Sequence, residues 1–254
     1  MTKSGKIALI TGGAKRIGAA IARDLAVHGF AVAIHCGRSR GEAVELAREL
    51  EESGGRAVVL QADLADARAA NALVGQTEKA LGLPDIIVNN ASVFEEDAVT
   101  DFDDEVWNRH FDVHVKAPAL LARALAASLP ADREALIVNM IDQRVWQLTP
   151  RFFSYTLSKS ALWTATRTMA QALAPRIRVN AIGPGPTLPN RRQEQADFDR
   201  QTEALLLGRG PSLDEFGAAV RFLWEARSVT GQMIALDGGQ HLAWETPDVA
   251  GVNE

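Results

Sequence analysis

The sequence contains few of the residues that mark a secreted, metal-binding or membrane-inserted protein. Its single cysteine, Cys36, excludes an internal disulfide and is typical of a cytoplasmic protein. The spacing of the five histidines suggests no metal site. The apolar stretch near the start, residues 7–10, is far too short for a signal sequence or a membrane span. We therefore expect a cytoplasmic protein with no bound metal and no membrane partner.

Basic segments are also lacking. The formal net charge is −5 and the chain has no run of basic residues, so it offers no positive surface for nucleic acid or anionic membranes. We expect neither as a partner. Apolar residues are abundant, at 47% of the 254 residues. Because α/β chains of this length often form one domain, we predict a single domain over residues 1–254.

Short apolar runs alternate with helical patterns along the whole chain. Strands are predicted at residues 7–10, 31–35, 57–60, 85–89, 135–140, 177–181 and 233–236, and helices at 17–30, 40–53, 66–81, 103–128, 152–174 and 212–226. The alternation predicts a Rossmann-type, doubly wound α/β fold with a seven-stranded, mainly parallel sheet and helices on both faces. The proline-rich residues 183–190 predict an irregular loop, followed by a mobile helix to about residue 207.

A glycine-rich turn follows the first predicted strand, with the sequence Thr11-Gly12-Gly13-Ala14-Lys15-Arg16-Ile17-Gly18. Glycines let the backbone approach a pyrophosphate, and the helix that follows supplies free N–H groups and a partial positive charge. The turn therefore predicts a dinucleotide site, although a plain strand-to-helix turn is the alternative. Arg16 stands where such turns usually have a glycine, and its cation can reach phosphate, ribose or substrate.

The end of the second strand indicates which dinucleotide is bound. An NAD site would place a carboxylate here, whereas a 2′-phosphate requires arginine and hydroxyl donors. Residues 35–40 read His-Cys-Gly-Arg-Ser-Arg and contain no acid. Arg38 and Ser39 therefore favour NADPH, with solvated loop charges as the alternative.

Polar residues also follow the third and fourth strands. Asp63, which precedes Leu64, can accept a hydrogen bond from an adenine amino group. The run Asn89-Asn90-Ala91-Ser92 can cap or pin the loop beneath the cofactor. Each motif alone is weak, but ligands of such sheets bind at the carboxyl ends of the strands, where both lie.

Tyr155 and Lys159 lie four residues apart in the long predicted helix, so they share one helix face. We expect the Lys159 ammonium to lie close to the phenol and to lower its pKa from about 10, which suits a proton donor or acceptor. Asp142 lies thirteen residues before Tyr155. An ionised Asp142 can only accept hydrogen bonds and would raise the tyrosine pKa that Lys159 lowers.

Together these motifs resemble the short-chain dehydrogenase/reductase family. The resemblance covers nearly the whole chain and rests on Thr11-Gly12-x-x-x-Arg16-x-Gly18, Asn89-Asn90-Ala91-Ser92, Tyr155-x-x-x-Lys159, Pro184-Gly185 and Asp237-Gly238-Gly239. Most members of the family have a serine where this chain has Asp142. That aspartate, Arg16, the His-x-x-Arg-Ser pattern at residues 35–39 and Phe94 resemble the pteridine reductases and bacterial dihydromonapterin reductases.

The resemblance implies NADPH-dependent hydride transfer, with Tyr155 and Lys159 in the catalytic places and Lys159 also holding the nicotinamide ribose. Thr187 matches the residue near the carboxamide. His114 falls where the family commonly has an asparagine of a proton relay to Lys159, and a structural histidine is the alternative. The cofactor contacts implied by these matches are Gly12, Arg16, Ile17, Gly18, Arg38, Ser39, Asp63, Leu64, Asn90, Ala91, Ser92, Tyr155, Lys159, Pro184, Gly185 and Thr187.

The expected substrate follows from Asp142. An aspartate suits a heterocycle that offers N–H donors, or, when protonated, it can deliver a proton to a ring nitrogen. We predict reduction of a pterin-like small molecule at a C=N bond, between the nicotinamide and Phe94, with Arg16 and Ser92 as polar contacts and residues 188–207 as a lid. Phe94 as a core or lid aromatic is the alternative for that residue.

Two other functions remain open at this point. One is an NADPH-dependent reductase of ketones or quinones, because this fold hosts many substrates. The other is a sensor or scaffold that binds NADPH without turnover, with Asp142 and His114 as remnants of a decayed relay. Intact Tyr155 and Lys159 argue against it.

The predicted helices at 103–128 and 152–174 are apolar over more than one face. One face must cover the sheet, so we expect the other to meet a second subunit. The resemblance favours a homotetramer over a dimer. The C-terminal tail, residues 241–254, is predicted either to order against a neighbour or to fray.

Overall fold

The computed structural model describes residues 5–189, 193–246 and 250. It contains one sheet of seven strands in the order β3-β2-β1-β4-β5-β6-β7, with parallel pairing throughout. The strands are β1 (Ile7–Ile10), β2 (Ala31–Cys36), β3 (Ala57–Gln61), β4 (Ile86–Asn89), β5 (Ala135–Met140), β6 (Ile177–Pro184) and β7 (Met233–Leu236). The predicted doubly wound fold is confirmed.

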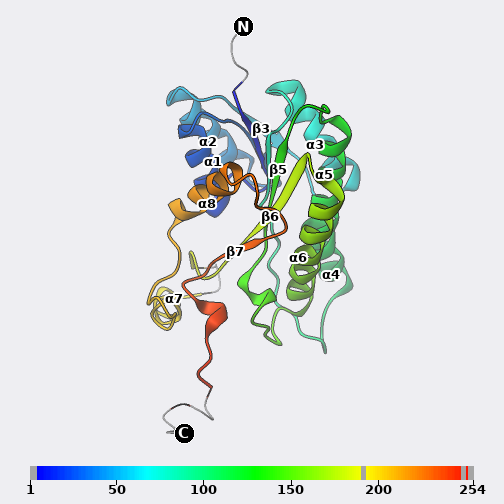
Figure 1. Ribbon diagram of the computed structural model, residues 1–254. Coiled ribbons are helices and arrows are strands. Elements are labelled where there is room, and N and C mark those ends of the chain that lie inside the picture. The colour runs from blue at the N-terminus through cyan, green and yellow to red at the C-terminus, as the bar shows by residue number, and fades with distance from the viewer. Residues whose placement is uncertain (1–4, 190–192, 247–249, 251–254) are drawn as a thin grey trace.

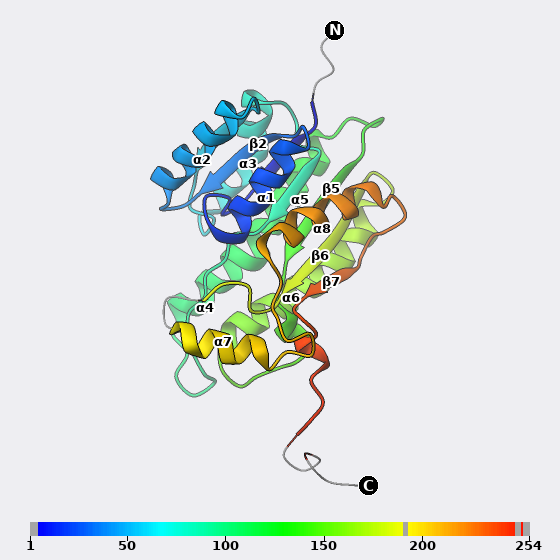
Figure 2. The same cartoon turned by 90° about the vertical axis from the view of Figure 1, so that its left-hand side faces the viewer.

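Helices cover both faces of the sheet (Figure 1). One layer contains α1 (Arg16–Val27), α2 (Arg40–Glu52) and α8 (Leu213–Glu225), and the other contains α3 (Ala67–Ala80), α4 (Asp104–Phe111), α5 (Ala117–Ser128) and α6 (Phe153–Leu173). A further helix, α7 (Gln195–Glu203), lies apart from both layers, below α8 in both views (Figures 1 and 2). None of the helices in the described part of the chain is long and apolar enough to cross a membrane.

The strands are apolar because both of their faces are buried. In β1, Ala8 and Ile10 pack toward α1 and α8, whereas Leu9 between them packs toward α3 and α5. Ile87 of β4 and its neighbours Ile86 and Val88 divide in the same way. Side chains of a strand alternate between the two faces, so a strand in this position must be apolar at every residue.

The predicted helix at 103–128 runs without a break from residue 104 to residue 128 and contains a π-helical turn. A π-helical turn, η1 (Asp112–Lys116), separates α4 from α5 and carries His114 into the interior. Pro118 lies in the first turn of α5, directly after this π-helical turn. The prediction of one long helix is therefore confirmed, with a π-helical turn at its centre.

Strand β6 is longer than predicted and includes Gly183 and Pro184, which were expected to be irregular. They pair with Ala235 and Leu236 of β7. Gly185 N–H donates to the Leu236 carbonyl at 2.8 Å, so the nitrogen of Pro184 faces the other way, beyond the end of β5. A proline is tolerated there because no partner strand needs its N–H.

Two predicted segments are described only in part. The mobile helix expected up to residue 207 ends at residue 203 as α7, and residues 190–192 lie outside the described residues. In the C-terminal tail, a short 3₁₀ turn covers Gln240–Leu242, and His241 Nδ1 lies 2.6 Å from an Asp237 carboxylate oxygen. Residues 247–249 and 251–254 of the tail lie outside the described residues.

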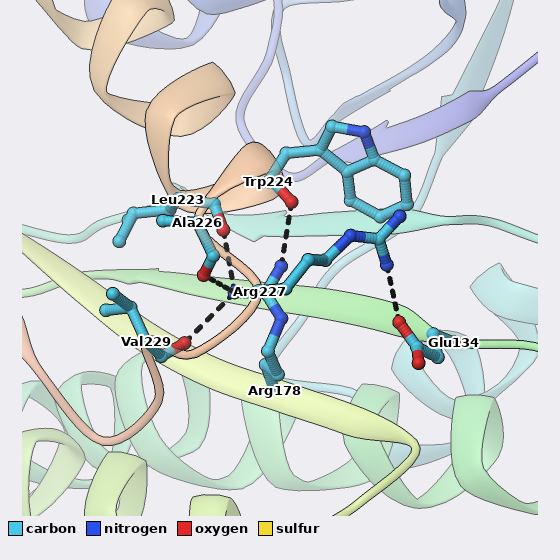
Figure 3. Close-up of polar contacts among 7 residues, drawn as sticks. All are labelled: Glu134, Arg178, Leu223, Trp224, Ala226, Arg227 and Val229. Atoms are coloured by element: carbon cyan, nitrogen blue, oxygen red, sulfur yellow. Dashed lines mark hydrogen bonds and ion pairs between the residues drawn. The ribbon is translucent and has the colours of Figure 1, made fainter.

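Arg178 on β6 joins the sheet to the end of α8 (Figure 3). Its guanidinium donates to the carbonyls of Leu223, Trp224, Ala226 and Val229 at 2.7 to 3.1 Å. The last carbonyls of a helix have no partners within it, and they carry a partial negative charge. One cation satisfies several of them and holds α8 in place beside α1.

Candidate active site

A cleft of about 1280 Å³ opens at the carboxyl ends of the strands. Its lining includes most of the residues predicted from the sequence, namely Gly12, Arg16, Ile17, Gly18, Arg38, Asp63, Asn90, Ala91, Ser92, Phe94, Asp142, Tyr155, Lys159, Pro184, Gly185 and Thr187. Ser39, Leu64 and His114 are not part of the lining. Parallel strands bring these distant segments to one edge of the sheet, as expected for a doubly wound fold.

The glycine turn after β1 is held in place by Asn90. The Asn90 Nδ2 donates to the carbonyls of Thr11 and Gly12 at 2.9 and 3.0 Å. A Cβ at Gly18 would lie 2.4 Å from the Gly12 oxygen and 2.5 Å from that Nδ2, so only glycine fits. The predicted pinning of this loop by the asparagine run is present in the structure.

His35 also supports the turn, which the sequence did not indicate. Its Nδ1 accepts from Gly12 N–H at 3.2 Å, and its Nε2 bonds the Ala62 carbonyl at 3.2 Å. Burial lowers the pKa of His35 and keeps the ring neutral. A histidine in an otherwise apolar strand was the available signal, but its partners lie 23 and 27 residues away.

The edge of the cleft beyond β2 is rich in cations. Arg38 is exposed at the rim, and Lys15 forms an ion pair with Glu42 of α2. Ser39 occupies the N-cap position of α2, but its hydroxyl makes no capping hydrogen bond. No acid follows β2 directly, so this edge suits a phosphate group better than ribose hydroxyls.

After β3, Asp63 and Leu64 point to different environments. Asp63 lines the cleft, and one of its carboxylate oxygens lies 3.7 Å from Arg109 of α4. The Leu64 side chain is buried in the core between the sheet and α3. The predicted cofactor contact is therefore wrong for the Leu64 side chain, because that side chain is part of the apolar core.

Asp142 and Tyr155 are joined directly. Tyr155 O–H donates to one carboxylate oxygen of Asp142 at 2.9 Å, and Arg144 N–H donates to the other at 2.9 Å. Burial raises the pKa of Asp142 above its ordinary value, with Arg144 opposing the shift most strongly. The carboxyl group can therefore hold a proton more readily than an exposed aspartate.

The predicted effect of Lys159 on Tyr155 is wrong in this structure. Burial and the Asp142 charge raise the pKa of Tyr155 well above its ordinary value, while Arg144 and Ser92 act in the opposite direction. The Lys159 ammonium donates to the Met140 carbonyl at 2.8 Å and lies 5.7 Å from the tyrosine ring centroid. Burial lowers the pKa of Lys159 to about 8. Tyr155 is thus a neutral phenol whose proton is shared with a carboxylate.

The hydrogen bonds of His114 go to residues other than Lys159. Its ring nitrogens form hydrogen bonds with Ser158 on α6 and with Ser92 and Val93 N–H in the loop after β4. These bonds occupy both nitrogens, so the structural alternative describes His114 better than a relay to Lys159.

An aromatic stack forms one side of the cleft. Phe94 stacks on Phe152 with centroids 4.3 Å apart and meets the Tyr155 ring edge-on at 4.8 Å. The Arg144 guanidinium carbon lies 5.3 and 4.7 Å from the Phe94 and Phe152 centroids, so it sits beside the stacked pair. The sequence pointed to Phe94 but missed Arg144, which also lines the cleft. Its Nη1 is buried with no hydrogen-bond partner among the described residues.

The segment predicted as a lid meets the glycine turn. Arg16 donates from its two guanidinium nitrogens to the carbonyls of Leu188 and Pro189 at 3.1 and 3.0 Å. From α7, Phe198 and Gln201 line the cleft. Arg16 therefore contacts the start of the predicted lid directly, which the sequence did not anticipate.

Comparison with known proteins identifies the class. The family model for short chain dehydrogenases matches residues 6–200, and the chain belongs to this family. It is similar to FolM alternative dihydrofolate reductase 1 from Brucella canis, crystallised with NADP, at 59% identity over 96% of this chain and 98% of that chain, with a TM-score of 0.92. The Brucella suis protein of the same name, in complex with NADP, is 60% identical over the same shares, with a TM-score of 0.94.

A further relative is an uncharacterized oxidoreductase of Methylorubrum extorquens. It is 35% identical over 243 residues, covering 92% of this chain and 97% of the relative. The resemblance predicted from the sequence motifs is confirmed, and the chain is an oxidoreductase. Within the described residues, no group of three or more His, Cys, Asp or Glu side chains is arranged to hold a metal ion.

Proposed function

We propose that this protein is an NADPH-dependent reductase that transfers hydride to a C=N bond of a dihydropterin-like heterocycle. The observation that carries the proposal is the 2.9 Å hydrogen bond from Tyr155 to Asp142. A serine at position 142 would donate to a substrate carbonyl, whereas a carboxylate accepts the tyrosine proton instead. A ring nitrogen is a base that can take a proton from this pair, so the pair suits an imine better than a ketone.

The cleft fits NADPH. Gly12 and Gly185 line the cleft and pack directly on neighbouring backbone, because a Cβ at Gly12 would lie 2.9 Å from the Ala91 Cα and one at Gly185 would lie 2.6 Å from the Asp237 Cα. The turn after β1 thus presents its backbone to a pyrophosphate. Arg38 at the rim is placed for the 2′-phosphate. NADPH supplies the hydride when bound. The two similar Brucella proteins were crystallised with NADP, which supports this cofactor.

The chain's own acid completes the reaction. Reduction of a C=N bond places hydride on carbon and requires one proton at nitrogen, which Tyr155 donates. Asp142, whose pKa is raised by burial, can hold a proton and return it to Tyr155. Lys159, fixed by the Met140 carbonyl, keeps a cation below the phenol and, as in the family, would hold the nicotinamide ribose.

The substrate would lie against the aromatic side of the cleft. Phe94 offers a ring for stacking, and Ser92 and Arg16 offer polar contacts near the glycine turn. The segment 188–207 would act as a lid over it, and Arg16 already bonds the first two carbonyls of that segment. The similarity to two dihydrofolate reductases of this family supports a pteridine ring as the substrate core.

A substrate panel tests the proposal. NADPH oxidation would be followed with dihydrobiopterin, dihydromonapterin, dihydrofolate and simple ketones or quinones. We expect turnover of at least one dihydropterin compound and poor turnover of the ketones. Faster reduction of ketones would favour a carbonyl reductase. NADPH binding seen as fluorescence quenching, with no turnover of any compound, would favour a sensor.

We also propose that the protein is a homotetramer. Large apolar side chains remain exposed around the start of α6, among them Trp146, Leu148 and Leu157 at 43%, 72% and 38%. Such exposure at neighbouring positions is typical of a surface that another subunit covers. Light scattering coupled to size exclusion would measure the mass, and a monomer would contradict the proposal.

A further inference from the structure

His114 is fully buried on η1 and has hydrogen-bond partners on two sides. Its Nδ1 lies 2.8 Å from Ser158 Oγ on α6. Its Nε2 lies 3.1 Å from the Val93 nitrogen and 3.0 Å from Ser92 Oγ. His114 therefore ties the loop after β4 to the helix that carries Tyr155.

The directions of these hydrogen bonds follow from two donors. The backbone N–H of Val93 points at Nε2, so Nε2 must be the nitrogen without hydrogen. Ser158 O–H donates to the Tyr155 carbonyl at 2.7 Å, which leaves the Ser158 oxygen to accept from Nδ1–H. Both observations require one neutral tautomer of His114, with its hydrogen on Nδ1. Burial and the nearby Lys159 charge lower the pKa of His114 well below its ordinary value and keep the ring neutral.

Because His114 Nε2 has no hydrogen, the Ser92 O–H is the donor in the hydrogen bond between Ser92 and His114. Ser92 also has a 3.3 Å contact with the Val93 carbonyl, which is longer than its 3.0 Å contact with His114. Ser92 also lies beside the Tyr155 oxygen. With the Ser92 hydrogen directed at the histidine and the Tyr155 hydrogen at Asp142, the Ser92 oxygen presents its lone pairs to Tyr155 and to the cleft. The Tyr155 oxygen also presents lone pairs to the cleft, because its O–H is directed at Asp142. Oxygens of Ser92, Tyr155 and Asp142 thus present acceptors to the cleft.

We infer that His114 is a positioning residue that makes Ser92 an acceptor, so that the cleft selects heterocycles with an amino or ring N–H group over analogues with a carbonyl in its place. This inference rests on the proposed reduction of dihydropterins and adds the hydrogen-bond polarity of the substrate. An asparagine at position 114 could turn either its oxygen or its NH₂ group to Ser92. The histidine cannot, because its two ring nitrogens bond Val93 N–H and Ser158 Oγ at the same time, which the shorter asparagine amide is unable to do.

The test compares two substrates that differ in one group. These are 6-methyl-7,8-dihydropterin and 6-methyl-7,8-dihydrolumazine, in which a carbonyl replaces the 2-amino group. We expect the wild type to prefer the dihydropterin in kcat/KM by roughly tenfold or more, as for one well-placed hydrogen bond and its loss. In His114→Asn the preference should fall to within about threefold, because Ser92 can then donate to the carbonyl.

His110→Asn is the matched control. His110 lies one turn before His114, and their rings stack with centroids 5.5 Å apart. Its Nδ1 bonds Ser154 Oγ of α6 at 2.7 Å, and its Nε2 accepts from Glu95 N–H instead of contacting Ser92. We expect His110→Asn to change the two rates together and to preserve their ratio. A ratio that falls equally in both variants would contradict the inference.

A second measurement needs no variant. In ¹⁵N NMR spectra of the wild type labelled at histidine, His114 should show hydrogen on Nδ1 and a bare Nε2. Hydrogen on Nε2, or a preference that His114→Asn leaves unchanged, would overturn the inference. Equal rates of the wild type with both substrates would overturn it while leaving the proposed function intact. If the wild type reduced neither compound nor any other dihydropterin, the proposed function itself would fail.

Discussion

Replacing Asp142 gives the sharpest test of the chemistry. In Asp142→Asn one acceptor oxygen of the carboxylate becomes an NH₂ group, and the partner that shares the Tyr155 proton at 2.9 Å loses its charge. General acid–base groups commonly contribute about 10²- to 10⁴-fold to a rate. Because Tyr155 itself remains, we expect a loss near the lower end, about 10²-fold in kcat for a dihydropterin.

The same change should shift the pH profile. The Asp142 charge and its hydrogen bond both raise the pKa of Tyr155, so removing the charge lowers that pKa. The basic limb of kcat/KM should therefore move to lower pH in Asp142→Asn. Asp142→Ser, which restores the residue usual in the family, should lose dihydropterin turnover and gain activity with ketones. Steady-state NADPH oxidation between pH 6 and 10 measures both effects.

Thermal unfolding provides an independent reading. Burial raises the pKa of Asp142 from 3.8, so the folded state holds this proton more tightly than the unfolded state. Its contribution to stability is complete at low pH and is lost as the pH rises through the raised pKa. Asp142→Asn should therefore gain Tm relative to the wild type at pH 8 but not at pH 4. Unchanged dihydropterin turnover in Asp142→Ser, with ketones still poor substrates, would refute the reasoning.

Three further changes test other parts of the molecule. Arg178→Met removes the cation that satisfies several carbonyls at the end of α8 and should cost about 3 kcal/mol in urea unfolding; a cost below about 0.5 kcal/mol would contradict that role. Burial lowers the pKa of Lys159 from 10.5 to about 8, so the unfolded chain binds this proton more tightly. As the pH is raised from about 8 to 10.5, the unfolding free energy of the cofactor-free protein should therefore rise by about 3 kcal/mol. This rise should be absent in Lys159→Met. Arg38→Ala should raise KM for NADPH by roughly 10- to 100-fold and leave KM for NADH nearly unchanged; equal effects on both would place the 2′-phosphate elsewhere.

The sheet could be predicted from the sequence because its strands are buried on both faces. Continuous apolar runs such as Ile7–Ile10 have few other places in a protein, and the glycine and polar residues after them mark the strand ends. The extension of β6 to Pro184 could not be predicted. Pro184 can extend β6 only because β5 ends before it, and the end of β5 is set about 40 residues earlier in the sequence.

The π-helical turn inside the helix at 103–128 could not be predicted for the same kind of reason. The local pattern continues through residues 112–116, and nothing near them in sequence breaks a helix. His114 instead finds partners 21, 22 and 44 residues away, at Val93, Ser92 and Ser158. Single π-turns often occur where a side chain is placed for function. The partners, and hence the turn, emerge only when the loop after β4 and α6 are brought together.

The error about Tyr155 shows the limit of helical spacing. Residues four apart do share a face, and Lys159 does lie below the ring. Its ammonium, however, is fixed by the Met140 carbonyl 19 residues earlier, and the phenol is fully buried and bonded to Asp142. Spacing predicts which groups are neighbours. Burial determines which of them controls the pKa.

Two departures from the usual family pattern act in the same direction. Asp142 takes the place of a serine and turns the Tyr155 hydrogen away from the cleft. His114 takes the place of an asparagine and, through Val93 and its tautomer, turns the Ser92 hydrogen away as well. A ketone needs donors at its oxygen, and both changes remove donors. A heterocycle with N–H groups and a basic ring nitrogen needs acceptors and one transferable proton. One departure alone could be tolerated by a carbonyl reductase, but both together favour the nitrogen heterocycle.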